Sequence, residues 1–445
     1  MSKALKSFFS LLLALSVLAV CSSPSVALSS EKSKKEKIVP PKESKPSAEK
    51  KSEKKPTLSR KEKKIFKEYL DYFEKIYDTM DQSYYQPLDR SAYDSFITKF
   101  KDDIYPQLLK EKKSDNYVRW RGAAYLVDYL KSKEDIFSAL FPPEPAKHYE
   151  QTALGVRMDV GIEGEKADAG FRVTQVEPRA DSYDQGLRIN DIIININGID
   201  VKTKAVQEIN ELLTPLVDTK VRIHYLDSTR SEKMIEVSPR EYFKQTVFPK
   251  PVHFSGVFCF EIRRFSQKTS EDLMRFLMFA KQQKNFKGLI LDLRGNPGGP
   301  PLAAREISAF FLTPGEEFAY FQKKGQPKAL LDVPKLPERF HYDGPLVILI
   351  DKGSGSSSEL FSGVMHKLKR ATLMGRNSAG QVMLKSMFHF DDQSMLLLVT
   401  ARGHYPDGDV FSFGGLVPDY PIRPTDDDRM VDFAAYYLTT HPSTN

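Results

Sequence analysis

Two apolar runs, each ending in a turn rich in glycine, limit how the C-terminal half of this chain folds. The first is GLILDLRGNPGG, from Gly288 to Gly299, and the second is VILIDKGSGSSSELFSG, from Val347 to Gly363. Each run is short, apolar and bounded by turn residues, which predicts a buried strand. The second turn delivers serines to the start of a helical segment, where the helix N-terminus favours negative charge. The pair therefore predicts a serine placed beside an anion-binding turn.

The N-terminus predicts export. Two lysines precede an apolar run from Phe8 to Val20 that is too short for a typical membrane span, and Ser25-Val26-Ala27 is a small-x-small cleavage pattern. We therefore predict a signal peptide over residues 1–27. Lipid attachment at Cys21, which follows a lipobox-like sequence, and an uncleaved anchor are the alternatives.

Residues 28–63 are rich in Lys, Glu, Ser and Pro and contain almost no apolar side chain. Such a composition cannot offset the loss of chain entropy, so we expect a disordered tether. The tether carries most of the lysine excess behind the net charge of +7, so this charge does not indicate nucleic acid binding. Its basic residues offer a contact with anionic lipid headgroups, and a solvated spacer is the simpler alternative.

Residues 64–143 predict a small helical domain. Apolar side chains recur at steps of three and four residues from Ile65 to Met80, and similar segments follow at 93–105 and 117–141. The segment ends at Pro142-Pro143, which is typical of a domain boundary.

Residues 150–240 change to short strands and turns. GLRINDIIININGIDV, from Gly186 to Val201, reads as two strands joined by a tight turn at Asn197-Gly198. This block resembles a PDZ domain. The resemblance places the carboxylate-binding loop at Leu154, Gly155, Val156 and Arg157. It implies that backbone amides of this loop hold a peptide's terminal carboxylate while the peptide adds a strand to an exposed edge; the alternative is a domain that only gates its neighbour.

Residues 250–445 resemble the core of the C-terminal processing peptidases, also called tail-specific proteases. The matching segments occur in the family's order: FCFEIRRFS, then GLILDLRGNPGG, then the serine-bearing run, then LLLVTARGHYPDGDVF. The resemblance implies a multidomain α/β protein. Its parts would be a helical N-terminal domain, a PDZ domain, and a mixed α/β protease core of the ClpP/crotonase-like type with a C-terminal helix.

The nucleophile of this family is the serine in the middle of a GSxSxSE-like stretch, which corresponds to Ser356. The resemblance implies that the backbone amide of Ser357 stabilises the oxyanion of a tetrahedral intermediate. A second donor would come from the turn at Gly298 and Gly299.

The proton acceptor is where this chain departs from the family pattern. The family uses a lysine whose pKa is lowered by burial, in a TFGKG-like motif, with a glutamine four residues later. Here Gln381 stands at the lysine position and Lys385 at the glutamine position. A glutamine amide accepts no proton near neutral pH.

Two hypotheses follow from this exchange. In one, Lys385 reaches the serine from the other corner of the site. Residues four apart on a strand lie about 13 Å apart, so this requires the strand to bend or bulge. In the other, the base is lost and the protein binds chain ends without cutting them.

We therefore predict an exported serine endopeptidase of the bacterial periplasm or cell envelope, which cleaves envelope proteins from recognised C-terminal tails through Ser356. The alternative is a catalytically impaired pseudoprotease or binding scaffold. No residues have zinc or calcium ligand spacing and no glycine loop has the P-loop pattern, so we expect no cofactor. The helical domain offers a docking surface for an adaptor or a second copy of the chain.

Overall fold

The computed structural model describes residues 60–154, 156–214, 219–323, 325–423 and 429–441. The predicted signal peptide, most of the predicted tether and Gly155 lie outside these ranges. Helix α2 (Arg60–Ser83) begins within the last residues of the predicted tether. Across the described part of the chain, no helix combines the length and the apolar surface that a membrane crossing requires.

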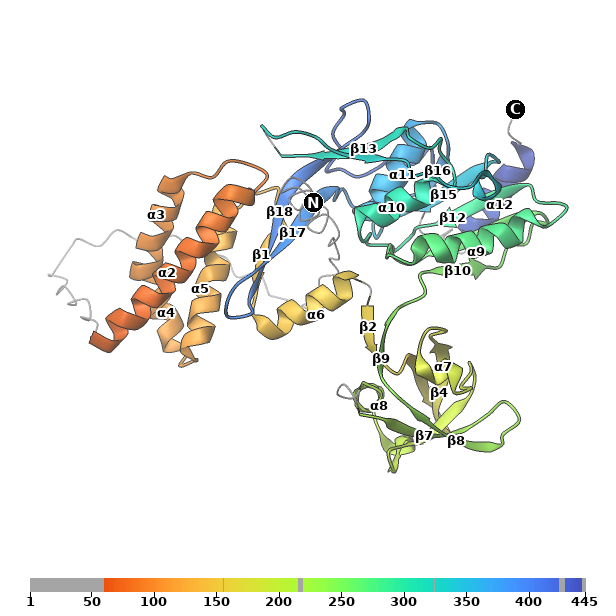
Figure 1. Cartoon of the computed structure of the whole chain (residues 1–445), viewed down its shortest axis with the longest axis horizontal. Coiled ribbons are helices and arrows are strands. Elements are labelled where there is room, and N and C mark those ends of the chain that lie inside the picture. Colours follow the sequence, from red (N-terminus) through yellow and green to blue (C-terminus); the bar gives the residue numbers. More distant parts are fainter. Residues whose placement is uncertain (1–59, 155, 215–218, 324, 424–428, 442–445) are drawn as a thin grey trace, which may run out of the picture.

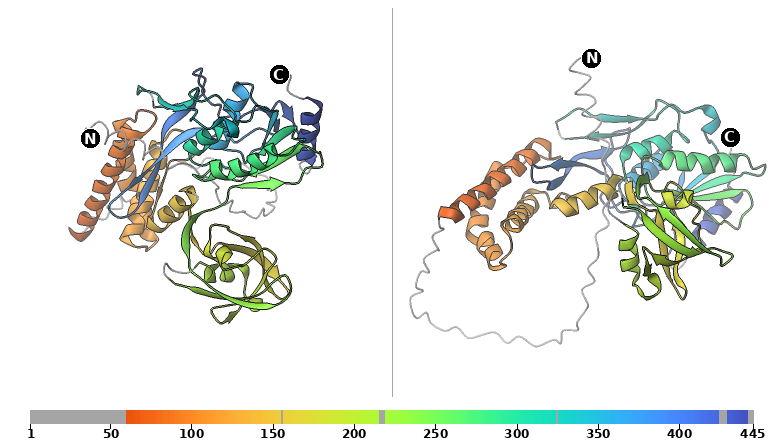
Figure 2. Two further views of the ribbon diagram at one scale, coloured as in Figure 1. Left: turned by 45° about the vertical axis from the view of Figure 1, so that its right-hand side comes forward. Right: turned by 60° about the horizontal axis from the view of Figure 1, so that its bottom comes forward.

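A helical domain forms one end of the molecule (Figures 1 and 2). It consists of α2, α3 (Arg90–Lys99), a π-turn (Phe100–Ile104), α4 (Tyr105–Lys110) and α5 (Asp115–Leu130). The apolar side chains that recur along α2 are buried, as their spacing predicts. The third predicted helical segment ends at Leu130, not near residue 141. The Asp135 carboxylate accepts the N–H groups of Phe137 and Ser138, which turns the chain, and β1 (Ala139–Phe141) then pairs with β18.

The middle of the chain folds as a PDZ domain with a core of its own. Its sheet has the spatial order β3 (Ile162–Ala167), β4 (Gly170–Val176), β5 (Ile192–Ile196), β7 (Val221–Leu226) and β8 (Glu232–Val237). It also contains α7 (Asp181–Asp184), β6 (Ile199–Asp200), a 3-10 turn (Val201–Thr203) and α8 (Val206–Leu212). Asn197 and Gly198 have φ values of 51° and 84°, so the predicted tight turn between β5 and β6 is confirmed. A ribbon of β2 (Val156–Asp159) and β9 (Arg240–Phe243) joins the domain to the rest (Figure 1).

The protease core is built on a six-stranded sheet. Its spatial order is β10 (Val247–Lys250), β11 (Val257–Ile262), β12 (Gly288–Asp292), β15 (Leu346–Ile350), β16 (Thr372–Gly375) and β19 (Tyr420–Pro421). All pairs are parallel except β10 with β11. Every residue of β12 and β15 is buried, which confirms the two apolar runs as interior strands. The sheet is packed by α9 (Thr269–Lys281), α10 (Pro301–Ser308), α11 (Ser357–Lys367) and the C-terminal helix α12 (Met430–Thr440).

A second sheet links this core to the helical domain. It contains β1, β18 (Met395–His404), β13 (Glu317–Gln322) and β14 (Ala329–Asp332), and β17 (Met383–His389) pairs with β18. Leu396, Leu398 and Val399 of β18 pack in the same apolar cluster as the helical domain. A 3-10 turn (Glu338–Phe340) precedes β15, and α6 (Pro143–Leu154) runs from β1 to the PDZ ribbon. The predicted multidomain α/β architecture is therefore confirmed.

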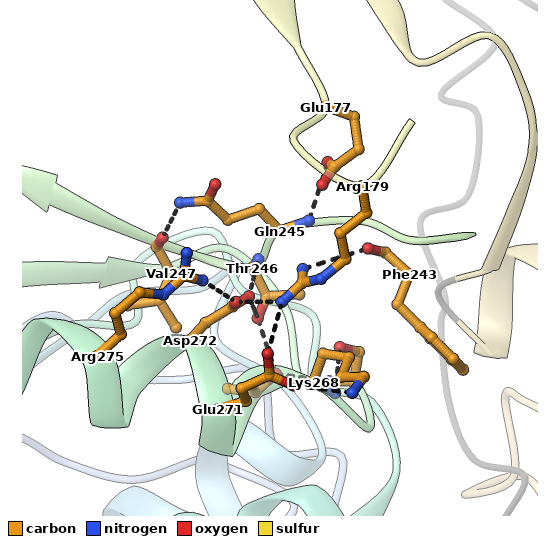
Figure 3. A network of polar contacts seen from close by, with 12 residues as sticks. Glu177, Arg179, Phe243, Gln245, Thr246, Val247, Lys268, Glu271, Asp272 and Arg275 are labelled. Carbon is orange, nitrogen blue, oxygen red and sulfur yellow. Dashed lines mark hydrogen bonds and ion pairs between the residues drawn. The ribbon is translucent and has the colours of Figure 1, made fainter. Parts of the chain in front are cut away.

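The PDZ domain is attached to the core through a network of polar contacts centred on Asp272 of α9 (Figure 3). The fully buried Asp272 carboxylate accepts from Arg179 of the PDZ domain at 2.7 Å, from Arg275 of α9 at 2.8 Å and from the backbone N of Thr246 at 2.9 Å. Glu177 of the PDZ domain accepts from the backbone N of Gln245 at 3.0 Å. Charged groups rather than a large apolar surface therefore hold the domain at this point.

We expect Arg179→Ala to loosen the PDZ domain, because the Asp272 carboxylate then loses its charged donor from that domain. The equilibrium for PDZ release should shift by about 1–3 kcal/mol, the usual effect of removing a charged hydrogen-bond partner. Trypsin should cut the basic segment between β9 and β10 faster than in the wild type. Arg275→Ala is the matched control, since it removes a donor to the same oxygen without crossing the domain boundary. Equal cleavage rates for the two variants would contradict the role of Arg179.

Candidate active site

Ser356 lies on the turn between β15 and α11, where the backbone is held in an uncommon conformation. Its φ is 52° and its ψ is −115°, and the residue is 7% exposed. A serine at positive φ costs about 1–3 kcal/mol and persists only where its surroundings enforce it. A sharp strand-to-helix turn of this kind presents a side chain at the helix N-terminus.

The neighbouring serines explain how the turn is enforced. Ser354 donates to the carbonyl oxygen of Leu293, Ser357 to that of Gly299 and Ser358 to that of Asn296, at 2.8, 2.6 and 2.8 Å. These hydrogen bonds connect the serine turn to the RGNPGG loop (Arg294–Gly299). The Ser356 hydroxyl forms no capping hydrogen bond with α11. Ser356 therefore differs from its neighbours in being available for chemistry.

The RGNPGG loop lies directly against Ser356, the predicted nucleophile. Gly298 has a φ of 100°, and a Cβ added there would lie 2.8 Å from both the backbone N of Ser357 and the Cβ of Ser356. Asn296 is fully buried and its Oδ1 accepts the Gly298 N–H at 2.9 Å. The Gly298 amide is thus already used. The Ser357 N–H, in the first turn of α11, has no acceptor within the helix and stays a candidate oxyanion donor.

Glu359 connects the turn that carries Ser356 to the segment that carries Gln381. One oxygen accepts the backbone N–H groups of Ser356 and Gln381, at 2.9 and 2.7 Å. The other accepts the Ser378 hydroxyl and the Gly380 N–H, both at 2.6 Å. The residue is 1% exposed. Burial raises the pKa of Glu359, and these hydrogen bonds act in the opposite direction.

Gln381 lies close to the turn that carries Ser356. Its Oε1 lies 3.4 Å from the position of a Cβ added at Gly355. Lys385 is 1% exposed and follows an irregularity in the β17–β18 register between Leu384 and Lys385. Its Nζ lies 4.3 Å from the centroid of the Phe137 ring.

The predicted PDZ loop is divided between two elements. Leu154 ends α6, whereas Val156 and Arg157 begin β2, which pairs with β9. Arg157 lines a cavity of about 360 Å³ together with residues of β3 and of the end of α8. This cavity adjoins β3, an edge strand of the PDZ sheet, which is where an added peptide strand would lie. A larger cavity, of about 990 Å³, adjoins the C-terminal end of α11, away from Ser356.

Comparisons with known proteins agree with this geometry. The sequence model of peptidase family S41 matches residues 257–422, and that of the PDZ domain matches residues 146–226. The carboxy-terminal processing protease CtpA of Bacillus subtilis (strain 168) is 24% identical over 320 residues, which cover 72% of this chain and 66% of the relative. A probable CtpA-like serine protease of Staphylococcus saprophyticus is 24% identical over 328 residues, covering 72% and 65%.

These matches support a C-terminal processing serine peptidase that contains a PDZ domain. The chain spans just under two thirds of the length of the curated relatives that it matches, 66% and 65%. The tricorn protease, a solved structure, aligns with a TM-score of 0.51 and 14% identity over 84% of this chain and 37% of that chain. This likeness concerns the fold alone.

Two residues of this candidate site, Glu359 and Asn296, were absent from the site predicted by sequence. The spacing of Ser356 and Glu359 is that of a capping box, which was a usable signal for the first. Asn296 carried no comparable signal, because its contacts depend on how the loop folds. Among the described residues, no cluster of three or more His, Cys, Asp or Glu side chains is arranged to hold a metal ion.

We expect Glu359→Gln to destabilise the peptidase domain. Each carboxylate oxygen faces a backbone N–H, which cannot reverse its direction, so the amide nitrogen of glutamine opposes a donor in either orientation. The unfolding free energy should fall by about 1–3 kcal/mol, measured by urea denaturation. Glu316→Gln, an exposed glutamate, is the control. An unchanged midpoint for Glu359→Gln would show that the hydrogen bonds do not hold the turn.

Proposed function

We propose that the protein is a serine endopeptidase of the C-terminal processing type with Ser356 as its nucleophile. The observation that carries this proposal is the hydroxyl of Ser356. The three serines around it donate their hydroxyls to the RGNPGG loop, whereas Ser356 is held at positive φ beside the Ser357 N–H. Such an arrangement suits attack on a carbonyl carbon rather than a structural role.

The reaction would follow from this placement. The Ser356 oxygen attacks the substrate carbonyl carbon and passes its proton to a base, while the Ser357 N–H stabilises the negative oxygen of the tetrahedral intermediate. The protonated base then gives the proton to the departing amine, leaving an acyl-enzyme. Water hydrolyses this ester and regenerates the serine.

Lys385 is the base that we propose. The register irregularity before it is the kind of strand distortion that its approach to Ser356 requires. A lysine side chain is long and flexible, so a rotamer change can move Nζ from the Phe137 ring towards the serine. Catalytic hydrogen bonds are often formed only when substrate is bound.

The second candidate is a pseudoprotease that binds chain ends without cutting them. It is favoured by Gln381, whose Oε1 reaches the nucleophile turn while Lys385 contacts Phe137. A glutamine in that place supplies a hydrogen-bonding group but no proton acceptor.

The substrates that we propose are envelope proteins with unstructured, apolar C-terminal tails. The curated relatives carry the name of carboxy-terminal processing proteases, and the PDZ cavity adjoins the open edge of β3. The PDZ domain would hold the tail and present the chain to Ser356. The same proposal includes export to the periplasm or cell envelope and tethering through the N-terminus. It also includes binding of an adaptor or a second copy of the chain to the helical domain.

The test is cleavage of an unfolded protein substrate by the purified mature chain. We expect Ser356→Ala to reduce the rate by at least about 10⁴-fold, because the nucleophile is lost. Ser362→Ala is the matched control, since this buried serine lies on the same helix and should leave the rate unchanged. Activity that survives Ser356→Ala would refute the assignment.

The base is tested by changing the exchanged pair. If Lys385 is the base, Lys385→Ala should reduce the rate about as strongly as Ser356→Ala, because the two residues act as a unit. If the site is dead, the wild type should not cleave and Gln381→Lys should restore cleavage. Loss of activity in Ser356→Ala with full activity in Lys385→Ala would point to another base.

A further inference from the structure

Arg264, in the segment that follows β11, is a partly buried cation, and two of its donor atoms lack an acceptor among the described residues. Its Nε and Nη2 atoms are buried and have no hydrogen-bond partner among the described residues. The adjacent Arg263 is 54% exposed, pairs with Glu261 at 2.9 Å and stacks on Phe248. Buried guanidinium groups in native proteins are normally paired, so an unpaired one requires an explanation.

Among the described residues, the groups that shift the pKa of Arg264 include a second cation and no carboxylate. Burial lowers the pKa of Arg264 to about 10; Tyr149 of α6 opposes this shift, and Arg157 of the PDZ ribbon adds to it. Arg157 therefore lies close enough for the two positive charges to interact. An anion placed between them would relieve both the repulsion and the missing hydrogen bonds.

The position of Arg264 connects the PDZ cavity with the nucleophile. The next residue, Phe265, donates its backbone N–H to the carbonyl oxygen of Gly298 at 3.0 Å, and Gly298 lies against Ser356. On the other side, Arg157 lines the cavity of about 360 Å³ in the PDZ domain. One arginine therefore belongs to the PDZ ribbon, and the other is adjacent in sequence to a residue that contacts the loop beside Ser356.

The ligand chemistry that suits this pair is a carboxylate. A carboxylate is planar and accepts two parallel N–H bonds from a guanidinium group. Because a peptide bound here enters by one end, we propose that Arg264 and Arg157 receive the C-terminal carboxylate of the substrate at the boundary between the PDZ domain and the peptidase core. This inference rests on the proposed function only for the identity of its ligand. It assigns the recognition of the free chain end to a residue outside the matched PDZ segment.

The experiment measures binding without cleavage. The full mature chain carrying Ser356→Ala is titrated against a fluorescein-labelled, unstructured peptide with an apolar tail, prepared as a free acid and as a C-terminal amide. We expect the acid to bind more tightly, and Arg264→Gln to reduce the ratio of the two affinities by about tenfold or more. Arg263→Gln, the exposed neighbour, should leave the ratio unchanged. Arg157→Gln should reduce it in part.

Three outcomes would overturn the proposal. In the first, the ratio of acid to amide affinity is unchanged in Arg264→Gln. In the second, Arg157→Gln alone abolishes the ratio, which would assign the carboxylate to the PDZ domain. In the third, an amidated peptide with a glutamate near its end binds as tightly as the free acid and loses affinity equally in Arg264→Gln. The last result would assign the pair to acidic side chains.

Folding is checked by thermal unfolding. Arg264→Gln should not lower the Tm, because it removes a buried charge that has no partner. A lowered Tm with equal loss of affinity for acid and amide would show a structural role and refute the proposal. The result is also separable from the proposed function. If the wild type does not cleave but binds the free acid more tightly through Arg264, only the proposed catalytic activity is contradicted. If the enzyme cleaves but Arg264→Gln leaves the acid preference unchanged, only this inference is contradicted.

Discussion

A single buried carboxylate, that of Glu359, is the contact on which the site depends. It receives backbone N–H groups from Ser356, Gly380 and Gln381, which come from two segments more than twenty residues apart in the chain. The helix N-terminus, the strained nucleophile turn and the segment before β17 are thereby fixed to one point. A carboxylate suits this role because its oxygens can only accept when ionised, and every group that faces them donates. The strain at Ser356 is sustained by these bonds and by the serines fastened to the RGNPGG loop.

The sequence predicted what depends on local pattern. The runs ending at Asp292 and Ile350 are interior strands because apolar composition and glycine turns leave few alternatives, and the Asn197-Gly198 turn follows from positive φ at both positions. The segment after Leu130 shows the limit. Its apolar residues continue a helical pattern, but pairing of β1 with β18, more than 250 residues later, decides its conformation. Contacts of that range leave no mark on a single sequence.

The exchange of Gln381 and Lys385 could be recognised in the sequence, but where each side chain lies relative to Ser356 could not be predicted from it. Which face of β17 a side chain occupies depends on the register with β18, and an irregularity falls between Leu384 and Lys385. A shift of one residue reverses the facing of every later side chain. The same holds for Arg264, which in the sequence is one of two adjacent arginines. Only the folded chain distinguishes the exposed, paired Arg263 from the partly buried Arg264.

The boundary between the PDZ domain and the core thus uses arginine in two ways. Arg179 is satisfied in the absence of ligand by the Asp272 carboxylate, so it holds the domain in place. Arg264 lacks such an anion, so a substrate carboxylate would supply acceptors for its unpaired N–H groups. If that carboxylate also contacts Arg157, the bound chain end joins the PDZ ribbon to the core and strengthens the attachment that Arg179 begins. Coupling of this kind is reciprocal: the factor by which a bound carboxylate favours the docked PDZ domain equals the factor by which docking favours carboxylate binding.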